Sequence, residues 1–550
     1  MHGLMQEWPL LCHKIIDHAA RQHGGREIVT RSVEGPITRT TYAGLRDRAL
    51  RVAARLEMEG YRPGDRIATM AWNSARHLEV WYGAMGMGGV YHTLNPRLFP
   101  DQIAWIMNHA SDRCLFVDLT FLPIVEKIAK DIPSLERIVV LTDGEHLPET
   151  APQGAVAYED WLAEAPDGFQ WRSFDESAAA GMCYTSGTTG EPKGVLYSHR
   201  SNVLHAMMAV MPDAMGLSAR DVVLPVVPMF HANAWGLAQS APMVGAKLVM
   251  PGPRLDGEGI YELLEAEKVT FTAAVPTVWL MLLQYLEKTG RKLPHLQRVV
   301  IGGSACPRSM TRKFQDHYDV EVIHAWGMTE MSPLGSLCTF KPEYQALAGE
   351  ERLDVQDKQG FAPFGVEMRI VDDERRELPW DGRTFGRLEV RGPAVASAYY
   401  GGAGSEQFDA EGWFDTGDVA HIDRYGYLKI TDRAKDVIKS GGEWISTIEL
   451  ENLAVGHPDV MEAAVVGIHH PKWGERPLLI VVPRDGASPT KEAMLDYLRG
   501  KVANWWLPDD VVVVEELPHT ATGKIQKTAL RRQFGDYRLP GSESMASPLL

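Results

Sequence analysis

The segment YTSGTTGEPKG at 184–194 combines three glycines, four hydroxyl side chains and a lysine, the groups that bind phosphate. Glycines let backbone N–H groups crowd around an anion, hydroxyls add donors, and the lysine adds positive charge. Pro192 precedes the lysine and Gly194 follows it, which does not fit the Walker A spacing of P-loop kinases. The apolar run before the segment predicts a strand-to-helix connection that cradles phosphate. Taken alone, the segment could also be a plain flexible loop. The residues expected at the phosphates are Thr185, Ser186, Gly187, Thr188, Thr189, Gly190 and Lys193.

Further candidate groups follow along the chain in HAWGMTE at 324–330 and WFDTGD at 413–418. Trp326 offers a stacking surface, Thr329 a hydroxyl and Glu330 a carboxylate. A single carboxylate near a triphosphate suits Mg²⁺, because this ion keeps most of its waters and bridges to phosphate. Asp418 could accept both hydroxyls of a ribose. Two later segments, DRAKDVIKSGGEWIS at 432–446 and ATGK at 521–524, add lysines and glycines.

A possible binding place for an acid lies in VPMFHANAWG at 227–236. His231 and Trp235 fall in an expected strand-to-helix turn, where they could form the entrance for a carboxylic acid. For His231 alone a structural histidine is the alternative, but its place beside Trp235 favours a functional one. Gly302 and Gly303 could leave room for an acyl chain, or serve only as turn residues after a strand.

Short apolar β-type runs alternate with helical patterns through most of the chain, which predicts sheets covered by helices on both sides. After about residue 360 the runs alternate apolar and polar residues, which indicates a small antiparallel, β-barrel-like part. A compact α+β segment follows the charged run 431–439. We therefore expect an α/β protein with a large N-terminal domain (1–431) and a small α+β C-terminal domain (438–550). Residues 432–437 join the two, and their charges suit an exposed connection.

Composition sets limits on the partners. The 550 residues exceed what one core usually holds, and the net charge of −16 argues against nucleic acid or an anionic membrane surface as partner. The five cysteines are scattered and form no C-x-x-C pair, so we expect small buried side chains in a reducing compartment. No stretch reaches the length of a transmembrane segment. These features predict a cytoplasmic protein; whether it is a homodimer stays open.

The five segments around 184–194, 324–330, 413–418, 432–446 and 521–524, in this order and spacing, resemble the adenylate-forming superfamily of acyl-CoA synthetases, carrier-protein adenylation domains and luciferases. The resemblance covers residues from about 20 to about 535. Within the superfamily, 227–236, 301–307 and 439–446 are most similar to medium- and long-chain fatty acyl-CoA synthetases and to 3-methylmercaptopropionate–CoA ligases. The resemblance implies that ATP and Mg²⁺ activate a carboxylic acid as acyl-AMP, with pyrophosphate released, and that coenzyme A then takes the acyl group and releases AMP.

The resemblance also implies residue roles. Residues 1–431 form the acyl- and ATP-binding adenylation domain, 432–437 a hinge that Lys435 marks, and 438–550 a mobile lid domain. Thr185 and Glu330 lie near Mg²⁺, and Lys524 is the catalytic lysine. His231, Trp235, Gly302 and Trp326 contact the acid, with His231 as a second catalytic candidate. The remaining nucleotide and CoA contacts are implied for Gly303, Ser304, His324, Ala325, Trp326, Thr329, Asp418, Arg433, Lys439, Gly441, Gly442 and Glu443.

The acid itself is not fixed by the sequence. Short-to-medium acids, 3-(methylthio)propionate among them, rank ahead of long-chain fatty acids, because Trp235, Trp326 and Met331 are bulky neighbours of an otherwise Gly- and Ala-rich path. A carrier-protein loading enzyme, a luciferase-like oxygenase and a catalytically silent acyl-nucleotide-binding protein are the alternatives. The residues at 439–443 favour CoA, and the presence of Lys524, Glu330 and Asp418 argues against a silent protein.

Overall fold

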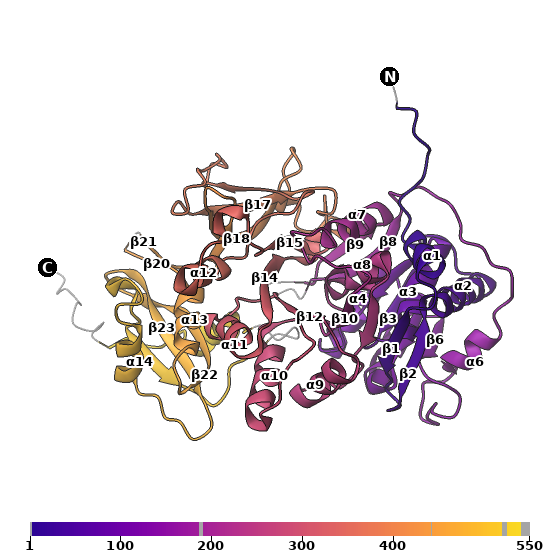
Figure 1. Ribbon diagram of the computed structural model, residues 1–550, viewed down its shortest axis with the longest axis horizontal. Coiled ribbons are helices and arrows are strands. Elements are labelled where there is room, and N and C mark those ends of the chain that lie inside the picture. The colour runs from indigo at the N-terminus through magenta and orange to yellow at the C-terminus, as the bar shows by residue number, and fades with distance from the viewer. Residues whose placement is uncertain (1–2, 186–190, 442, 520–524, 541–550) are drawn as a thin grey trace.

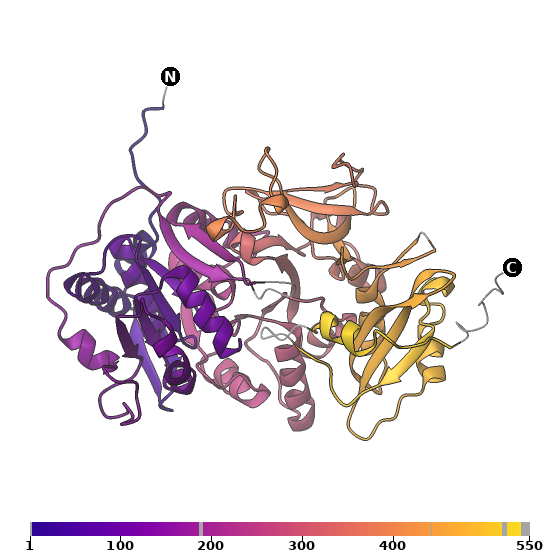
Figure 2. The same cartoon turned by 180° about the vertical axis from the view of Figure 1, so that it is seen from behind.

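The computed structural model describes residues 3–185, 191–441, 443–519 and 525–540. Two large sheets with their helices form most of the molecule, a smaller antiparallel sheet lies beside them, and the C-terminal residues form a separate unit at one end (Figure 1). The reverse view shows the same arrangement, with the C-terminal unit next to the sheet that carries β12–β14 (Figure 2).

The first large sheet has eight strands in the order β15-β14-β13-β12-β10-β11-β1-β2. Strands β1 and β10–β14 run parallel, whereas β2 and β15 are antiparallel strands at its two edges. The strands are β1 (Glu27–Arg31), β2 (Ile37–Thr41), β10 (Val222–Pro225), β11 (Lys247–Met250), β12 (Phe271–Ala274), β13 (Arg298–Ile301), β14 (Glu321–Gly327) and β15 (Leu334–Leu337).

The second large sheet has seven strands in the order β7-β6-β5-β3-β4-β8-β9, parallel except for the edge strand β9. Its central strands are buried on both faces, which explains their continuous apolar sequences. The seven strands of this sheet are β3 (Arg66–Met70), β4 (Val90–Thr93), β5 (Cys114–Val117), β6 (Arg137–Val140), β7 (Val156–Ala157), β8 (Ala179–Tyr184) and β9 (Gly194–Ser198).

Twelve described α-helices precede residue 360, and several of them pack between or over the two large sheets. Local sequence sets their ends: Thr41 and Ser74 accept a hydrogen bond from the backbone N–H three residues on, and Gly88 and Gly290 end helices in left-handed backbone. They are α1 (His13–Gln22), α2 (Tyr42–Met58), α3 (Ala75–Met87), α4 (Pro100–Ala110), α5 (Leu122–Ile128), α6 (Tyr158–Ala163), α7 (His199–Ala209), α8 (Leu237–Val244), α9 (Gly257–Ala266), α10 (Pro276–Thr289), α11 (Arg308–Tyr318) and α12 (Gly349–Gln356).

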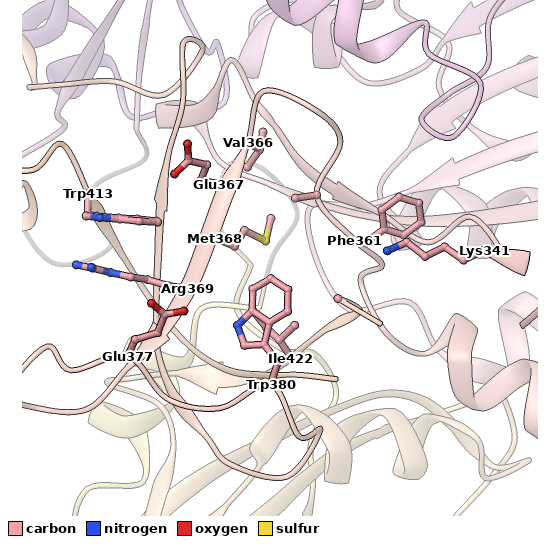
Figure 3. Close-up of a pocket in the computed structure, with 12 residues that line it drawn as sticks. Lys341, Phe361, Val366, Glu367, Met368, Arg369, Glu377, Trp380, Trp413 and Ile422 are labelled. Carbon is pink, nitrogen blue, oxygen red and sulfur yellow. The ribbon is translucent and has the colours of Figure 1, made fainter. Parts of the chain in front are cut away.

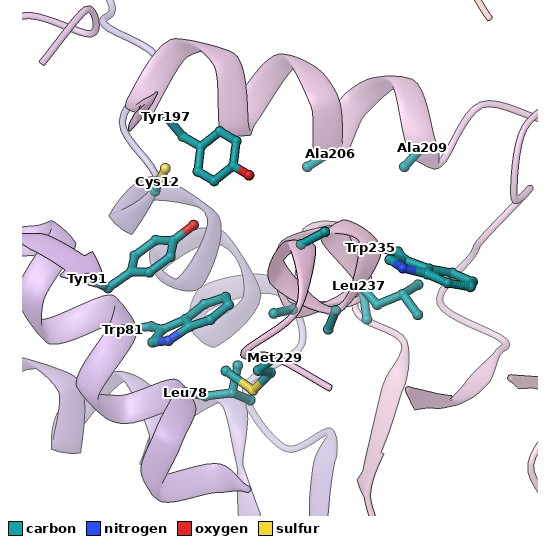
Figure 4. Packing of buried hydrophobic residues seen from close by; sticks show 14 of the residues in the cluster. Cys12, Leu78, Trp81, Tyr91, Tyr197, Ala206, Ala209, Met229, Trp235 and Leu237 are labelled. Carbon is teal, nitrogen blue, oxygen red and sulfur yellow. The ribbon is translucent and has the colours of Figure 1, made fainter. Parts of the chain in front are cut away.

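The main core lies where these helices meet the sheets. Trp81 of α3 stacks on Tyr91 of β4 with ring centroids 4.3 Å apart, and Leu237 of α8 and Tyr197 of β9 belong to the same buried cluster (Figure 4). In that view Trp235 points away from the Trp81–Tyr91 stack, on the other side of α8. The core thus ends beside the segment that carries Trp235.

Two smaller sheets complete the chain. An open antiparallel sheet contains β16 (Glu367–Val371), β17 (Gly386–Arg391), β18 (Phe414–Ile422) and β19 (Leu428–Arg433). The C-terminal unit, called the lid below, contains β20 (Ile438–Ser440), β21 (Glu443–Ile445), α13 (Thr447–Val455), β22 (Val460–His470), β23 (Gly474–Pro483), α14 (Lys491–Leu498), β24 (Asp510–Val513) and α15 (Lys527–Gln533).

The predicted α/β class, with helix-covered sheets and a small α+β unit after them, is confirmed. Two local expectations are wrong. The segment 184–194 joins β8 to the antiparallel strand β9, so it is a strand-to-strand connection and no helix N-terminus follows it directly. The expected hinge is exposed only in part, because Asp432 and Val437 are buried. No described helix is long and apolar enough to cross a membrane, and all five cysteines are buried and free.

Candidate active site

Candidate residues gather where strands end. Gly302 follows β13, and Thr329 follows β14, at the carboxyl edge of the eight-stranded sheet. Crevices at this edge of parallel sheets are the usual place for ligands. Thr185 directly follows β8 of the other large sheet, and the Tyr197 hydroxyl on β9 donates to the Thr329 carbonyl at 2.7 Å. The two sheets therefore meet at the predicted site.

The two ends of the phosphate segment are held together. The Thr185 N–H donates to the Lys193 carbonyl at 2.9 Å, and the Lys193 N–H donates to Thr185 Oγ1 at 3.3 Å. The Lys193 ammonium donates to Gln407 Oε1 at 2.6 Å and lies 4.8 Å from the centre of the Tyr399 ring. Ser186, Gly187, Thr188, Thr189 and Gly190 lie outside the described residues.

Tyr399, which lies beside Lys193, also holds Glu330. The Tyr399 hydroxyl donates to Glu330 Oε1 at 2.6 Å, and burial together with this carboxylate raises the pKa of Tyr399, which keeps the hydroxyl protonated. The Ala396 N–H donates to the Glu330 carbonyl at 2.7 Å. The described residues contain no group of three or more His, Cys, Asp or Glu that could hold a metal alone. Oxygen donors from Glu330 and Thr185 nevertheless fit Mg²⁺, because that ion takes most of its ligands from water and phosphate.

Asp418 connects three parts of the large unit. The Trp326 indole N–H donates to Asp418 Oδ2 at 3.0 Å, and Arg433 Nε lies 2.9 Å from Asp418 Oδ1. Arg433 also donates to the Thr416 carbonyl at 3.0 Å. Asp418 is only 3% exposed, so its charge is neutralised by Arg433 rather than by water. A carboxylate offers about four lone-pair sites, which leaves acceptor capacity for ribose hydroxyls.

The segment after His231 has an uncommon backbone. Four consecutive non-glycine residues, Ala232 to Trp235, have φ values of 43° to 55°, and Gly236 follows with φ 79° before α8 begins. Left-handed backbone costs an L-residue roughly 1–2 kcal/mol, so such a turn persists only when its surroundings hold it. The expected turn between β10 and α8 is present, and its strain is typical of a functional segment.

Trp235 fills the space that Gly302 and Gly303 leave. A Cβ atom on Gly302 would lie 3.3 Å from the Trp235 ring, and one on Gly303 would lie 3.7 Å from it and 3.0 Å from Val275. Gly303 also has φ +80°, which favours glycine. In this arrangement the two glycines leave room for the aromatic ring of Trp235. Ala325 comes close as well, since its carbonyl lies 2.9 Å from the position of a Cβ on Gly302.

Two further predicted nucleotide contacts are His324 on β14 and Ser304 after β13. His324 is buried, its Nδ1 faces the Gln356 carbonyl at 3.3 Å, and burial lowers its pKa to about 4. Its ring is therefore neutral and engaged with α12. Ser304 is exposed in the loop after β13.

The lid residues of the predicted CoA face surround the hairpin β20–β21. Lys439 is exposed and pairs in register with Trp444. Gly441 has φ +61°, and its N–H donates to the Trp473 carbonyl at 2.8 Å; a Cβ there would lie 2.8 Å from the Trp473 ring. Glu443 begins β21, and Lys435 is exposed in the connection before β20. Gly442 and Lys524 lie outside the described residues.

Comparison with known proteins now places the chain. The model of the AMP-binding enzyme family matches residues 16–400, and that of the AMP-binding enzyme C-terminal domain matches 449–524. The chain belongs to the AMP-binding enzyme family. It is 49% identical to the 3-methylmercaptopropionyl-CoA ligase of Ruegeria pomeroyi over 98% of this chain and 99% of that protein. It is also 49% identical to the medium-chain-fatty-acid–CoA ligase of Ectopseudomonas oleovorans, over 99% and 100%.

Solved structures show the same fold. The anthranilate CoA ligase AuaEII, solved with anthranoyl-AMP, superposes with a TM-score of 0.84 over 96% of this chain and 98% of that chain, at 24% identity. At this identity the likeness concerns the fold alone. The resemblance to adenylate-forming enzymes, and to medium-chain and 3-methylmercaptopropionate ligases within them, is thus confirmed. Ligases of this family use ATP and CoA.

One pocket of this AMP-binding family member lies away from these residues. It has a volume of about 470 Å³ on the open antiparallel sheet, between β16 and the segments that carry Trp380 and Trp413 (Figure 3). The Arg369 guanidinium lies 4.3 Å from the centre of the Trp413 ring, so this aromatic face is already covered. None of the residues predicted for the active site lines this pocket.

Sequence reasoning missed Tyr399, Gln407 and Tyr197, which hold Lys193, Glu330 and Thr329. None of them falls in one of the segments that the sequence analysis assigned to the site. The only signal was the tyrosine pair at 399–400 close to the WFDTGD segment. Their partners lie at least 69 positions away, so only the fold brings them together.

Proposed function

We propose that the enzyme is an AMP-forming acyl-CoA ligase for short-to-medium acids. A carboxylic acid and ATP would give acyl-AMP and pyrophosphate, and acyl-AMP and CoA would then give acyl-CoA and AMP. Two groups of contacts carry this proposal, in a chain so similar to CoA ligases: Trp326 and Arg433 on Asp418, and Tyr399 between Lys193 and Glu330. Thr185 joins the second group through its hydrogen bond with Lys193. These side chains suit an adenosine, its ribose and a magnesium triphosphate.

The first step joins two anions, so catalysis there is mainly alignment and charge neutralisation. The acid carboxylate attacks the α-phosphate, and pyrophosphate leaves. Lys193 and Lys524 would offset the negative charge that builds up on the phosphates, and His231 would orient the acid. Asp418 would hold the ribose, while Arg433 holds Asp418 in place. Mg²⁺ bound by Glu330, Thr185 and the phosphates would supply further neutralisation.

The second step requires that the CoA thiol reach the acyl carbon. Lys524 and the face formed by Lys439, Gly441, Gly442 and Glu443 belong to different ends of the lid, so one lid orientation would not present both to the same carbon. We propose that the lid turns about 432–437, with Lys435 as pivot, between the two half-reactions. The exposed Trp473 beside Gly441 adds an aromatic surface to the proposed CoA face.

The acid size follows from Trp235. Its ring occupies the space over Gly302 and Gly303, which leaves less depth for a long chain. This contact, together with the similarity to medium-chain and 3-methylmercaptopropionyl-CoA ligases, supports short-to-medium acids, 3-(methylthio)propionate among them.

The test is pyrophosphate release with ATP and Mg²⁺ across straight-chain acids from acetate to palmitate, with 3-(methylthio)propionate and benzoate added, each with and without CoA. We expect the fastest turnover among acids of three to eight carbons and the appearance of acyl-CoA and AMP only with CoA. Faster turnover of palmitate would indicate a long-chain synthetase. ATP binding without pyrophosphate release for any acid would indicate a silent nucleotide-binding protein.

A further inference from the structure

Hydrogen bonds help to hold the left-handed turn at 232–236 in its shape. Within the backbone, the Ala234 N–H donates to the Pro228 carbonyl at 3.3 Å. From another strand, the Cys183 thiol donates to Asn233 Oδ1 at 3.2 Å. Asn233 is 1% exposed, and its amide nitrogen has no hydrogen-bond partner among the described residues. Flipping the amide would leave the oxygen unpaired instead, so in either orientation Cys183 is the partner that fixes it.

Cys183 contacts three segments of the site at once. Its sulfur lies 3.0 Å from the Thr93 hydroxyl of β4, which donates to it when the thiol donates to Asn233. Burial raises the pKa of the Cys183 thiol to about 11, and hydrogen bonds from Thr93, from the Tyr197 hydroxyl and from the N–H groups of Asn233 and Ala232 oppose this rise. Cys183 is thus a neutral thiol and not a nucleophile at physiological pH.

The contact between Cys183 and Asn233 joins the strand before the phosphate segment to the turn that carries His231 and Trp235. Cys183 lies on β8 two residues before Thr185, which begins the phosphate segment, and Asn233 lies between His231 and Trp235. Tyr197, on the strand paired with β8, holds the Thr329 carbonyl next to Glu330. The segments assigned to phosphate, acid and magnesium therefore share one buried hydrogen-bonded centre.

We propose that Asn233 and Cys183 are positioning residues, which hold the turn carrying His231 and Trp235 in its left-handed form against the strand that leads into Thr185. This inference rests on the proposed function, because it assigns the acid to that turn. Asparagine suits the role twice over: it tolerates left-handed backbone better than most residues, and its carboxamide reaches the thiol. A loosened turn would misplace His231 and Trp235 and leave the phosphate segment intact.

The experiment compares KM for the acid with KM for ATP in four variants, by pyrophosphate release with the acid that the wild-type enzyme turns over fastest. Cys183→Ala removes the donor, and Asn233→Gly removes the amide but keeps the left-handed backbone accessible. We expect each to raise KM for the acid about three- to tenfold, the loss of one hydrogen bond, with KM for ATP changed less than about twofold. Cys183→Ser keeps a donor and should stay near wild type. Ala234→Gly is the matched control, since it eases the same turn without touching the contact.

A double-mutant cycle decides whether the two residues act as a pair. Cys183→Ala combined with Asn233→Gly should raise KM for the acid no further than the more affected single variant. Additive effects, or equal changes in both KM values together with a lower melting temperature, would overturn the proposal and leave a purely structural role. Wild-type enzyme that releases no pyrophosphate with any acid would instead contradict the proposed function.

Discussion

Asp418 and Asp432 lie on neighbouring strands, one step apart in the β18–β19 register, and both are almost completely buried, at 3% and 1% exposed. Asp418 contacts Trp326 of β14 and Arg433, which lies near the start of the expected hinge 432–437. Asp432 instead accepts from the Thr447 N–H at 2.8 Å and from its hydroxyl at 2.5 Å, both at the start of α13 in the lid. Two buried aspartates thus have different partners: Asp418 contacts candidate site residues, and Asp432 joins the large unit to the lid.

The surroundings of Asp432 strengthen this contrast. Lys527 of α15 bonds to Thr447 and lies 2.8 Å from Glu451 of α13, and Arg531 pairs with Asp436. Burial raises the pKa of Asp432, whereas Lys527 and Thr447 oppose that rise. These charges link the connection 432–436 to the lid in this orientation. A buried charged contact between units that move must be remade in each orientation, whereas the contact of Asp418 with Trp326 lies within the large unit and need not change. The predictions below test this difference, from the largest expected effect to the smallest.

Lys524→Ala should have the largest effect, on the lid side of the comparison. A charge that acts only on the transition state affects kcat more than KM, so adenylate formation should fall by about 100-fold or more. Thioester formation from pre-made acyl-AMP should stay largely intact. Rapid-quench assays of each half-reaction measure both. An equal fall in both would mean that Lys524 is structural.

Asp418→Asn should weaken the use of ATP at the candidate active site. The amide can still accept from Trp326, but the ion pair with Arg433 and two charged acceptor positions for ribose are lost. Charge-assisted hydrogen bonds contribute roughly 1.5–3 kcal/mol each, so kcat/KM for ATP should fall about 10- to 100-fold. Asp423→Asn is the control, because Asp423 is also buried and paired, with Lys358 at 2.6 Å, outside the site. Similar losses in both variants would argue against a ribose contact.

Lys435→Pro should restrict φ at the proposed pivot and remove a backbone donor. We expect thioester formation to slow by about tenfold, more than adenylate formation does, with ATP affinity little changed. Measuring each half-reaction separately, together with ATP binding by calorimetry, provides the check. Full retention of thioester formation would show that the pivot lies at another residue.

Asp432→Ala should change the balance between the half-reactions. The variant loses the acceptor for the Thr447 N–H and the charge near Lys527, which hold this lid orientation. We expect one half-reaction to speed up and the other to slow, each by about two- to fivefold. If both rates keep their ratio, the contact persists in both orientations and Asp432 moves with the lid.

Asp118→Asn serves as a buried aspartate outside both regions, and it should affect stability alone. Burial raises the pKa of Asp118 from 3.8 to about 7, so the folded state binds the proton more tightly than the unfolded chain. Stability should therefore fall as pH rises from about 4 to 7 and level off above it. In the wild-type protein the Trp72 N–H donates to the Asp118 carboxylate at 2.7 Å, and the oxygen of an asparagine amide can accept the same hydrogen bond. The variant should gain melting temperature relative to wild type at pH 8 but not at pH 5, with both half-reactions unchanged; an equal difference at both pH values would contradict this.

The sequence by itself determined the fold class and most elements. The run 270–276 became β12, buried along its whole length, and the alternating runs at 365–373, 385–393 and 426–433 became an antiparallel sheet. Five lid elements, α13, β22, β23, α14 and β24, also lie where the sequence pattern predicted them, whereas β20, β21 and α15 were not predicted. Periodicity reports which side of an element faces the core, and this property is local.

Only the tertiary structure decided what the site residues contact. The sequence placed a helix after 184–194, but β9 pairs back onto β8 there, because Tyr197 completes a sheet edge that no local pattern reveals. It left Cys183 as a small buried side chain, whereas the fold sets its thiol between Thr93 and Asn233, 90 and 50 positions away. It described 432–437 as an exposed connection, yet Asp432 is buried against Thr447. Such partners come from different sheets and units, and a hydrogen bond within 3 Å depends on how those units pack, which no stretch of sequence encodes alone.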